Sequence, residues 1–498
     1  MTQLDDRLVR EMVQKVLEHI QTGWGPTSTS APRVANAATT APFAQRPPAA
    51  IGGHAPDGRW GQFSNVDAAV SAAKAAQLAL MRQSMTVRKE ICQTIRDICR
   101  ERAEELGNLE YEETRIGHKP HKPLKMLAVA NNPMGVGFIP TECFSGDHGI
   151  TLEEHAPWGV LGVVTPVTHS LPTLAHNAIN MIAAGNSLVC NPHPSGKRIA
   201  ALGARLFNQA IQERTGIDNL ICVMVEPTLE SAREIFSHPG IRLLAITGGP
   251  GVVAAALRSG KRAICAGPGN PPVVVDASAD IDNAATCILE GASFDNNLLC
   301  LSEKEAFVEA AVYDQLMAAL EAVGAYRLSS SQMDQLAKLC IVPGKDGEHG
   351  HANREYVGAD PQVIAEMIGL RIPPACRMLF GPTDWEHPFV QVEQMMPVLP
   401  IVRCATFDEC VERALQAEHG FCHTAVIHSR LVDHMTQMGK AVNTTLYVKN
   451  GPSVAGNGSG GEGYGGWSIA GATGEGIATP LTYTRVRRCA MIDNLRII

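Results

Sequence analysis

The sequence lacks the features that mark membrane, secreted and nucleic-acid-binding proteins. No apolar run among its 498 residues reaches the roughly 18 residues that a membrane-spanning helix needs. The first residues contain no basic segment followed by an apolar core, so they do not predict a signal peptide. The 50 acidic residues outnumber the 42 basic ones, and a net charge of −8 argues against a nucleic acid or an anionic membrane as partner. We therefore expect a cytoplasmic protein.

The sequence also lacks the cysteine and histidine patterns that form disulfide frameworks or bind metals. Its fourteen cysteines are scattered without a CxxC pair, which is typical of thiols in a reducing compartment. Four histidines in Pro/Gly-rich loops have no carboxylate or cysteine partners at metal-ligand spacing, so we predict solvated loop residues and no metal site. These histidines are His118, His121, His349 and His351.

Residues 1–20 are predicted to form a separate unit. Apolar residues recur every four positions from Leu4 to Ile20 and charged residues fill much of the remaining surface, which indicates an amphipathic helix. Residues 21–50 are rich in Ala, Pro, Thr and Ser and nearly uncharged, which predicts a flexible linker. A helix tethered by such a linker is expected to dock outside the core of its own chain. The alternative is a helix that packs on its own domain or takes part in oligomer contacts.

The rest of the chain alternates between predicted strands and helices. The strands are expected at residues 160–165, 187–191, 220–225 and 243–247. This alternation predicts an α/β fold with a doubly wound parallel sheet, whose ligands bind outside the carboxyl ends of the strands.

The length of the chain allows two or three domains. We predict a first α/β domain over residues 51–275 and a second over residues 276–450. Residues 451–498 are predicted to form a Gly-rich return segment and a final strand.

Two glycine-rich segments are candidates for a phosphate-binding loop. Residues 456–461 satisfy the GxGxxG pattern, but no predicted strand leads into them and no predicted helix follows, so they fail the structural test. Thr247, Gly248 and Gly249 instead follow a predicted strand and open a helix, whose free N–H groups can hold a pyrophosphate. Such turns are also glycine-rich for steric reasons, so this segment alone leaves both interpretations open.

Cys300 is the candidate nucleophile. It ends a short polar turn, residues 293–300, between two apolar stretches. A thiol at the end of a turn rich in backbone N–H groups can attack a carbonyl carbon while the amides hold the oxyanion. Residues 267–272, with the sequence GPGNPP, precede this turn. A buried structural cysteine is the alternative for Cys300, and the other thirteen cysteines are interpreted as core residues or inert surface thiols.

Together these motifs resemble the aldehyde dehydrogenase superfamily, and in particular its CoA-acylating branch, which includes propionaldehyde dehydrogenases of bacterial microcompartments. The match runs from about residue 66 to residue 488. The resemblance implies a Rossmann-type cofactor domain, a second α/β catalytic domain, NAD as cofactor and coenzyme A as co-substrate. It also implies a homodimer or homotetramer, with an oligomerisation strand at the C-terminus. Residues 1–20 resemble an encapsulation peptide, which implies a shell protein as partner and a location within a microcompartment.

The resemblance assigns roles to residues at matching positions. Cys300 is the nucleophile, and Glu393 matches the glutamate that binds the nicotinamide ribose. His169 stands where the family usually has an oxyanion-binding asparagine; a neutral imidazole still offers one N–H donor, and packing at the turn is the alternative. The other cofactor-binding positions lie at the ends of three predicted strands. Thr165 and Pro166 lie at the end of the first, Pro192, His193 and Pro194 follow the second, and Thr247, Gly248 and Gly249 lie at the end of the third.

Cys265 is a second departure from the family pattern. Hydrolytic relatives carry a glutamate at this position, which activates water on the thioester. Without that base, water is a poor acceptor and an external thiolate is a better nucleophile. The resemblance therefore implies that an aldehyde, NAD⁺ and CoA give acyl-CoA and NADH through a thioacyl enzyme on Cys300. The alternatives are a hydrolytic dehydrogenase that releases the free acid and an inactive shell-associated paralogue.

The substrate is less well defined by the sequence. Ser293 and Phe294 near Cys300 suggest a small aldehyde pocket. Acetaldehyde, propionaldehyde and lactaldehyde all fit this expectation.

Overall fold

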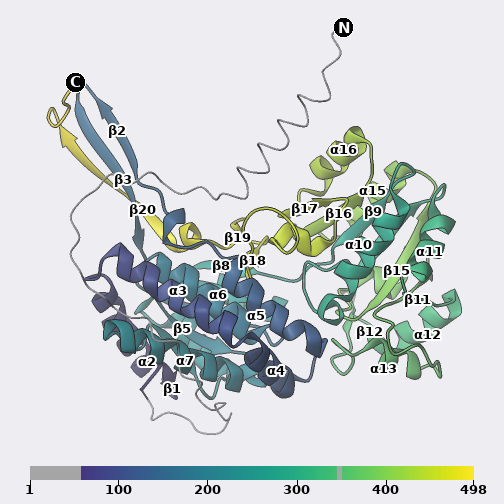
Figure 1. Ribbon diagram of the computed structural model, residues 1–498, viewed down its shortest axis with the longest axis horizontal. Coiled ribbons are helices and arrows are strands. Elements are labelled where there is room, and N and C mark those ends of the chain that lie inside the picture. The colour runs from purple at the N-terminus through teal and green to yellow at the C-terminus, as the bar shows by residue number, and fades with distance from the viewer. Residues whose placement is uncertain (1–57, 345–349) are drawn as a thin grey trace, which may run out of the picture. The chain divides into compact units, whose positions relative to one another are not determined.

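The computed structural model describes residues 58–344 and 350–498. The helix predicted at residues 1–20 and the linker predicted at 21–50 lie outside these ranges. Within them the chain forms two parallel sheets, each covered by helices on both faces (Figure 1). The predicted α/β class is therefore confirmed.

The first sheet is doubly wound, with the strand order β1-β6-β5-β4-β7-β8 and every pair parallel. From β4 the chain moves outward through β5 and β6, then returns to the other side of β4 through β7 and β8. The topological switch point therefore falls between β4 and β7. The strands are β1 (Gln62–Phe63), β4 (Val160–Thr165), β5 (Ser187–Pro192), β6 (Ile221–Met224), β7 (Ile241–Thr247) and β8 (Arg262–Ala266).

Helices cover both faces of this sheet, and all residues of β4 and β5 are buried. Burial on both faces explains why these strands are continuous apolar runs in the sequence. One face is covered by α2 (Val66–Leu80), α8 (Leu229–Ser237) and α9 (Pro250–Leu257). The other carries α6 (Ser170–Ala183) and α7 (Lys197–Thr215), beneath an outer layer of α3 (Met85–Glu101), α4 (Ala103–Thr114) and α5 (Lys122–Asn131).

The second sheet has seven parallel strands in the order β11-β14-β15-β10-β9-β16-β17. Because β9 already belongs to it, the chain passes between sheets at residues 267–271, slightly earlier than the predicted boundary at 275. The strands are β9 (Pro272–Val275), β10 (Glu305–Glu309), β11 (Tyr326–Arg327), β14 (Leu379–Thr383), β15 (Val398–Cys404), β16 (Thr424–His428) and β17 (Leu446–Lys449).

The side chains of β9 alternate between two apolar clusters, as the pleat of a strand requires. Val273 and Val275 pack with the helices α10 (Ile281–Ser293) and α11 (Tyr313–Ala322), and Val274 packs with α15 (Phe407–Ala417) and α16 (Val432–Val442). The smaller elements are α12 (Ser330–Cys340), α13 (Pro361–Glu366), α14 (Pro388–Gln391), and the short antiparallel pair β12 (Ile341–Val342) and β13 (His351–Ala352).

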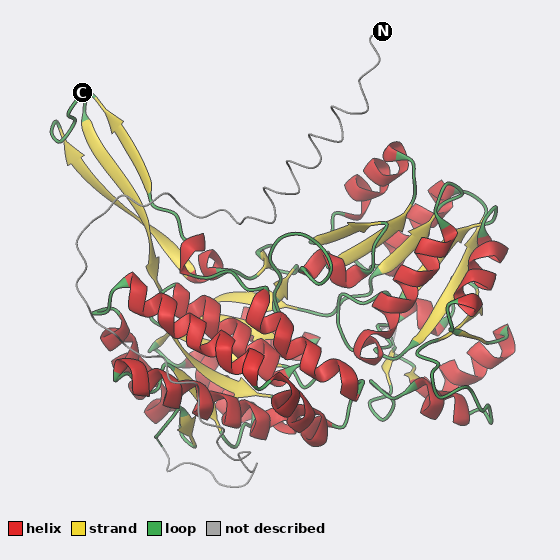
Figure 2. Ribbon diagram, viewed as in Figure 1, coloured by secondary structure: helices red, strands yellow, loops and turns green. Residues whose placement is uncertain are grey.

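A third, antiparallel sheet joins β2 (Glu142–Gly146), β3 (Gly149–Pro157) and β20 (Thr484–Ile492). Figure 2 shows these three strands without a helix over either face. The return segment before β20 contains the short pair β18 (Ile469–Ala470) and β19 (Gly476–Ile477). Among the described residues, no helix is both long and apolar enough to cross a membrane.

Candidate active site

The carboxyl ends of β4, β5 and β7 gather most of the residues predicted to hold the cofactor. Thr165 ends β4 and is paired with Pro192 at the end of β5, and Thr247 ends β7 on the other side of β4. His193 donates its backbone N–H to Thr165 O at 3.1 Å, and both His193 and Pro194 are exposed. The structure therefore places these residues at the switch point, where open α/β sheets bind nucleotides.

Gly249 leaves room for a ligand at the start of α9. Its φ of −67° is available to any residue, so the backbone does not require glycine here. A Cβ added at Gly249 would meet no atom within 4 Å. This open space would let a phosphate group approach the free N–H groups of the helix, as the sequence analysis predicts. Thr247 Oγ1 lies 3.0 Å from Ser468 Oγ, which connects the return segment to the same edge.

The turn before Cys300 has an unusual backbone. Asp295, Asn296 and Asn297 adopt positive φ values of 49°, 55° and 63° in succession. Asp and Asn tolerate this left-handed region better than most residues, but each such residue stores strain that its surroundings must hold. Asn296 Nδ2 donates to Gly358 O and Asp360 Oδ1. Asn297 Nδ2 donates to Ala292 O and Glu303 O, on either side of the turn.

A buried ion cluster connects this turn to the His169 segment. Asp295 Oδ2 accepts hydrogen bonds from Lys122 Nζ at 3.0 Å and Lys125 Nζ at 2.6 Å, and all three side chains are fully buried. Burial opposes ionisation of Asp295, but the two ammonium groups hold the pKa of its carboxyl below the usual value. Lys125 Nζ also donates to Thr168 O at 2.7 Å. The Lys125 side chain therefore connects the nucleophile turn to Thr168, the residue before His169.

His169 lies immediately before α6 as its N-cap residue and is buried. Burial, together with the charges of Lys125 and Lys122, holds the pKa of its imidazole well below the usual value. The ring is therefore neutral at physiological pH and has one N–H to donate, which excludes the protonated form as the oxyanion donor. Its Nδ1 has no hydrogen-bond partner, and its ring centroid lies 5.2 Å from that of Trp467.

We expect His169→Asn to retain substantial activity and His169→Ala to lose roughly 10²-fold or more in kcat, because only the amide can replace the N–H donor. Steady-state NADH formation measures both. His176→Ala is a matched control, since His176 is another buried histidine of α6 with a pKa of about 4. Equal kcat for wild type and His169→Ala would mean that backbone groups alone hold the oxyanion.

Cys300 follows the turn and is half-buried. Burial and the nearby Glu393 carboxylate raise the pKa of its thiol to about 12, while Lys304 and the backbone N–H groups of Cys300 and Leu301 oppose this rise. The thiol is therefore protonated at neutral pH and must lose its proton as it reacts. The same two N–H groups lie where they can hold an oxyanion formed beside the sulfur.

Residues 267–272 contact the nucleophile turn through Gly269. A Cβ added there would lie 2.5 Å from Cys300 O and 2.9 Å from Cγ of His423, so close approach requires glycine. Gly269 N donates to Glu393 Oε1 at 3.3 Å. Burial raises the pKa of the Glu393 carboxyl, and Lys304 and this hydrogen bond oppose the rise. The predicted role of Glu393 in binding the nicotinamide ribose stays a prediction.

These segments share one edge of the second sheet. Pro271, Lys304 and His423 lie immediately before β9, β10 and β16, and Glu393 lies in the segment between α14 and β15. The four strands are parallel neighbours in the order β15-β10-β9-β16, so their amino ends lie together. The candidate catalytic groups of this sheet thus lie at its amino edge, whereas ligands were expected outside the carboxyl ends of the strands of the doubly wound sheet.

His423 is a site residue that the sequence analysis missed. Its side chain is buried, its Nδ1 lies 2.8 Å from Thr424 Oγ1, and its Nε2 has no partner. Burial, followed by the charge of Lys304, lowers the pKa of the ring to about 4. No local motif marks this histidine, because only the strand order brings it to Gly269.

Two of the loop histidines contact the nucleophile turn. His121 does so through its ring, so its prediction as a solvated residue was wrong, whereas His118 does so through its backbone and its side chain is 36% exposed. His121 Nδ1 accepts a hydrogen bond from Asp295 N at 2.8 Å, and its ring stacks on Phe294 at 4.7 Å. His118 donates its backbone N–H to Asp295 Oδ1 at 2.9 Å. His351 is exposed, as predicted; His349 lies outside the described residues.

Cys265 is buried in β8, within the apolar cluster between the first sheet and α9. Burial, followed by the charge of Glu475, raises the pKa of its thiol to about 11. It therefore cannot replace the missing glutamate as a base at neutral pH. Ser293, predicted to line the aldehyde pocket, is buried and accepts a hydrogen bond from Arg377.

Comparison with known proteins identifies the family. Residues 59–335 match the aldehyde dehydrogenase family. The acetylating acetaldehyde dehydrogenase of Salmonella typhimurium is 43% identical over 88% of this chain and 94% of its own length. The chain therefore belongs to the aldehyde dehydrogenase family.

Solved structures of the same branch are also similar. The propionaldehyde dehydrogenase of the Clostridium phytofermentans fucose utilisation microcompartment has a TM-score of 0.85 at 43% identity, covering 88% of this chain and 100% of that one. A Rhodopseudomonas palustris propionaldehyde dehydrogenase, with bound CoA and an acylated cysteine, has a TM-score of 0.85 at 40% identity over 88% of this chain and 100% of that one. The predicted resemblance to CoA-acylating enzymes is confirmed.

Proposed function

We propose that this protein is an NAD-dependent, CoA-acylating aldehyde dehydrogenase, which converts a short-chain aldehyde, NAD⁺ and CoA to acyl-CoA and NADH. The observation that carries the proposal is the Cys300 site. There a thiol lies beside two backbone N–H groups, and the position of the water-activating glutamate is taken by the buried Cys265.

The reaction begins at Cys300. Its thiolate attacks the aldehyde carbon, and the new oxyanion accepts hydrogen bonds from the Cys300 N–H and the neutral His169. The Glu393 carboxylate lies near this turn and can take the thiol proton. The unpartnered Nε2 of His423 can take it in the tautomer that carries the ring proton on Nδ1.

The edge formed by β4, β5 and β7 suits NAD⁺. The N-terminus of α9, opened by Gly248 and Gly249, would hold the pyrophosphate, and the segment from Pro192 to Pro194 would pack against the adenosine ribose. Bound there, the nicotinamide supplies the hydride acceptor.

The second half of the reaction releases the acyl group from Cys300. The CoA thiolate attacks the carbonyl carbon of the thioacyl enzyme, a new C–S bond forms, and Cys300 leaves as a thiolate. The oxyanion of this step has the same position as in the first step, so the same two donors serve both. Water competes poorly because Cys265 supplies no base.

Incubating the purified protein with NAD⁺, CoA and each of acetaldehyde, propionaldehyde and lactaldehyde tests the proposal. We expect NADH and the matching acyl-CoA in equal amounts with at least one of them. Failure to form acyl-CoA from any of the three would reject the proposed activity.

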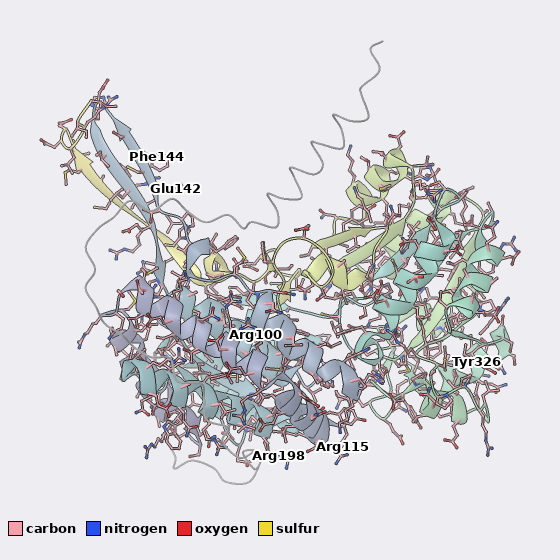
Figure 3. The ribbon with its side chains drawn as sticks, in the orientation of Figure 1. Arg100, Arg115, Glu142, Phe144, Arg198 and Tyr326 are labelled. Carbon is pink, nitrogen blue, oxygen red and sulfur yellow. The ribbon has the colours of Figure 1, made fainter. Side chains whose placement is uncertain are left out.

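We further infer that the three-stranded sheet is covered by a second copy of the chain in a homodimer or homotetramer. Its strands expose large apolar side chains, with exposed fractions of 54% for Phe144, 59% for Val486 and 65% for Ile492. Phe144 and Glu142 are labelled on β2 in Figure 3. Uncovered edge strands such as β2 and β20 readily pair with another chain.

We also propose that residues 1–20 bind a microcompartment shell protein. Removing them is expected to leave kcat and KM of the purified enzyme within about twofold, since the sequence predicts a flexible linker between them and the catalytic domains. A fluorescent protein fused to residues 1–20 should co-localise with assembled shells in cells. The matched control carries Leu8→Glu and Met12→Glu on the apolar face, and diffuse fluorescence of the unaltered fusion would contradict docking.

A further inference from the structure

Lys304 is a buried lysine in contact with the nucleophile turn that the proposed reaction does not yet use. Its side chain is fully buried. Its Nζ lies 2.9 Å from Asn297 O, 2.5 Å from Asn297 Oδ1 and 3.0 Å from Leu299 O. All three acceptors are uncharged oxygens of the turn. Three acceptors at hydrogen-bond distance need three N–H donors, so the side chain is an ammonium.

The backbone of Lys304 is held on both sides. Its N–H donates to Pro271 O at 3.0 Å, and its carbonyl accepts from Gln394 Nε2 at 2.8 Å. These partners lie before β9 and β15, the two neighbours of β10, whose first residue follows Lys304. Lys304 therefore connects the turn, the Gly-Pro segment and the segment that carries Glu393.

The contact with Leu299 O determines the direction of a catalytic N–H. Leu299 O and the Cys300 N–H belong to one peptide group, and in a planar trans peptide they point in opposite directions. No cis peptide bond occurs in the described residues. Leu299 O accepts from Lys304 Nζ and from Ser302 N at 3.1 Å, which uses both lone pairs of the oxygen. The Cys300 N–H is thereby directed away from Lys304.

The same ammonium holds the strained part of the turn. Asn297 has a φ of 63°, and Lys304 Nζ binds both its carbonyl oxygen and its side-chain oxygen. A residue in the left-handed region persists only when its surroundings stabilise that conformation. The buried ammonium of Lys304 does so by donating hydrogen bonds to two oxygens of Asn297.

We propose that Lys304 is a positioning residue for acyl transfer, which fixes the Leu299–Cys300 peptide so that the Cys300 N–H meets the oxyanion. The inference rests on the proposed function, because this oxyanion forms only if Cys300 attacks a carbonyl carbon. The positive charge on Leu299 O also polarises the peptide group and makes the Cys300 N–H a stronger donor.

Several titratable groups face Lys304, and they bear on any pH-dependent measurement. Burial lowers the pKa of the Lys304 ammonium, and nearby acids oppose this shift. Burial keeps the pKa of Glu305 well above its usual value and raises that of Glu303 to about 7. The groups that face Lys304 are Glu303, Glu305, Glu393, Cys300 and His423.

The first test compares Lys304→Met with Lys261→Met. Lys261 is a matched control because its Nζ also binds two carbonyl oxygens, His238 O and Ile241 O, but outside the site. We expect Lys304→Met to lower kcat by about 10²-fold or more, the usual effect of losing an oxyanion donor, with KM for the aldehyde within about threefold. Lys261→Met should leave kcat within about twofold. A folded, active Lys304→Met with kcat within about threefold of wild type would overturn the inference.

Alkylation of Cys300 by iodoacetamide separates positioning from a general loss of structure. This reaction needs the thiolate but forms no oxyanion, so Lys304→Met should slow it by at most about tenfold, far less than kcat. Mass spectrometry identifies which cysteines react. If buried cysteines such as Cys190 become alkylated, the role is structural and the inference is wrong. If alkylation of Cys300 falls in parallel with kcat, Lys304 acts by stabilising the thiolate, and the inference is again wrong.

The two proposals fail in different ways. A wild-type protein that makes no acyl-CoA rejects the proposed function, whereas an active wild type with an undisturbed Lys304→Met rejects the inference alone. If Lys304→Met does not fold, a crystal structure of the wild-type acyl enzyme decides. A thioester oxygen about 3 Å from Cys300 N, with Nζ on Leu299 O, supports the inference. A thioester oxygen turned away from Cys300 N, or Nζ turned to Glu393, overturns it.

Discussion

Replacing Cys300 by alanine is expected to reduce NADH formation below about 1% of the wild-type rate while leaving the fold and NAD⁺ binding nearly intact. The variant removes the nucleophile, and the turn keeps its contacts because they are made by Asp295, Asn296 and Asn297 rather than by the sulfur. Steady-state absorbance at 340 nm measures the rate, and thermal unfolding with and without NAD⁺ measures the fold and the binding.

Cys143→Ala is the matched control for Cys300→Ala. Cys143 lies on β2 of the third sheet, outside the two sheets that carry the candidate site, so its replacement should leave the rate within about twofold. A Cys300→Ala protein that keeps more than a few per cent of the activity would reject Cys300 as the nucleophile.

Without CoA, the enzyme is expected to release about one equivalent of NADH per active site and then nearly stop, with steady turnover once CoA is added. The reason is the absence of a base at Cys265, whose thiol has a pKa of about 11 and is buried. Stopped-flow absorbance measures the burst, and mass spectrometry after incubation with propionaldehyde and NAD⁺ identifies the products. Free propionate that accumulates equally fast with and without CoA would show a hydrolytic enzyme instead.

Cys265→Glu tests the same point from the other direction. We expect it to raise CoA-independent turnover only modestly, because the new carboxyl group would be buried in the apolar cluster near Glu475, which raises its pKa and keeps more of it protonated and unable to accept a proton from water at neutral pH. Cys190→Ala, another buried cysteine of the first sheet, should leave CoA-independent turnover unchanged. If the wild-type protein, which lacks the new glutamate, already turns over equally fast with and without CoA, the proposal is contradicted.

Local sequence patterns determined much of the first domain. The run at 160–165 is a strand in the structure with the same bounds, and the strands predicted at 187–191 and 220–225 appear as β5 and β6 within one residue. Continuous burial and helical periodicity are local properties, so a sequence carries them directly. The glycines after β7 and the polar turn before Cys300 were likewise visible in the sequence, because each is a short run of consecutive residues.

The tertiary structure alone decided how the site is assembled. Lys125 reaches Asp295 across 170 residues, and His423 reaches Gly269 because β16 lies beside β9. Such contacts depend on the order of strands in the sheet, which periodicity and composition do not encode. Lys304 lies in a run of charged residues, which in a sequence indicates a solvated surface. Its burial follows from the central place of β10 between β9 and β15, where its ammonium donates hydrogen bonds to oxygens of the nucleophile turn.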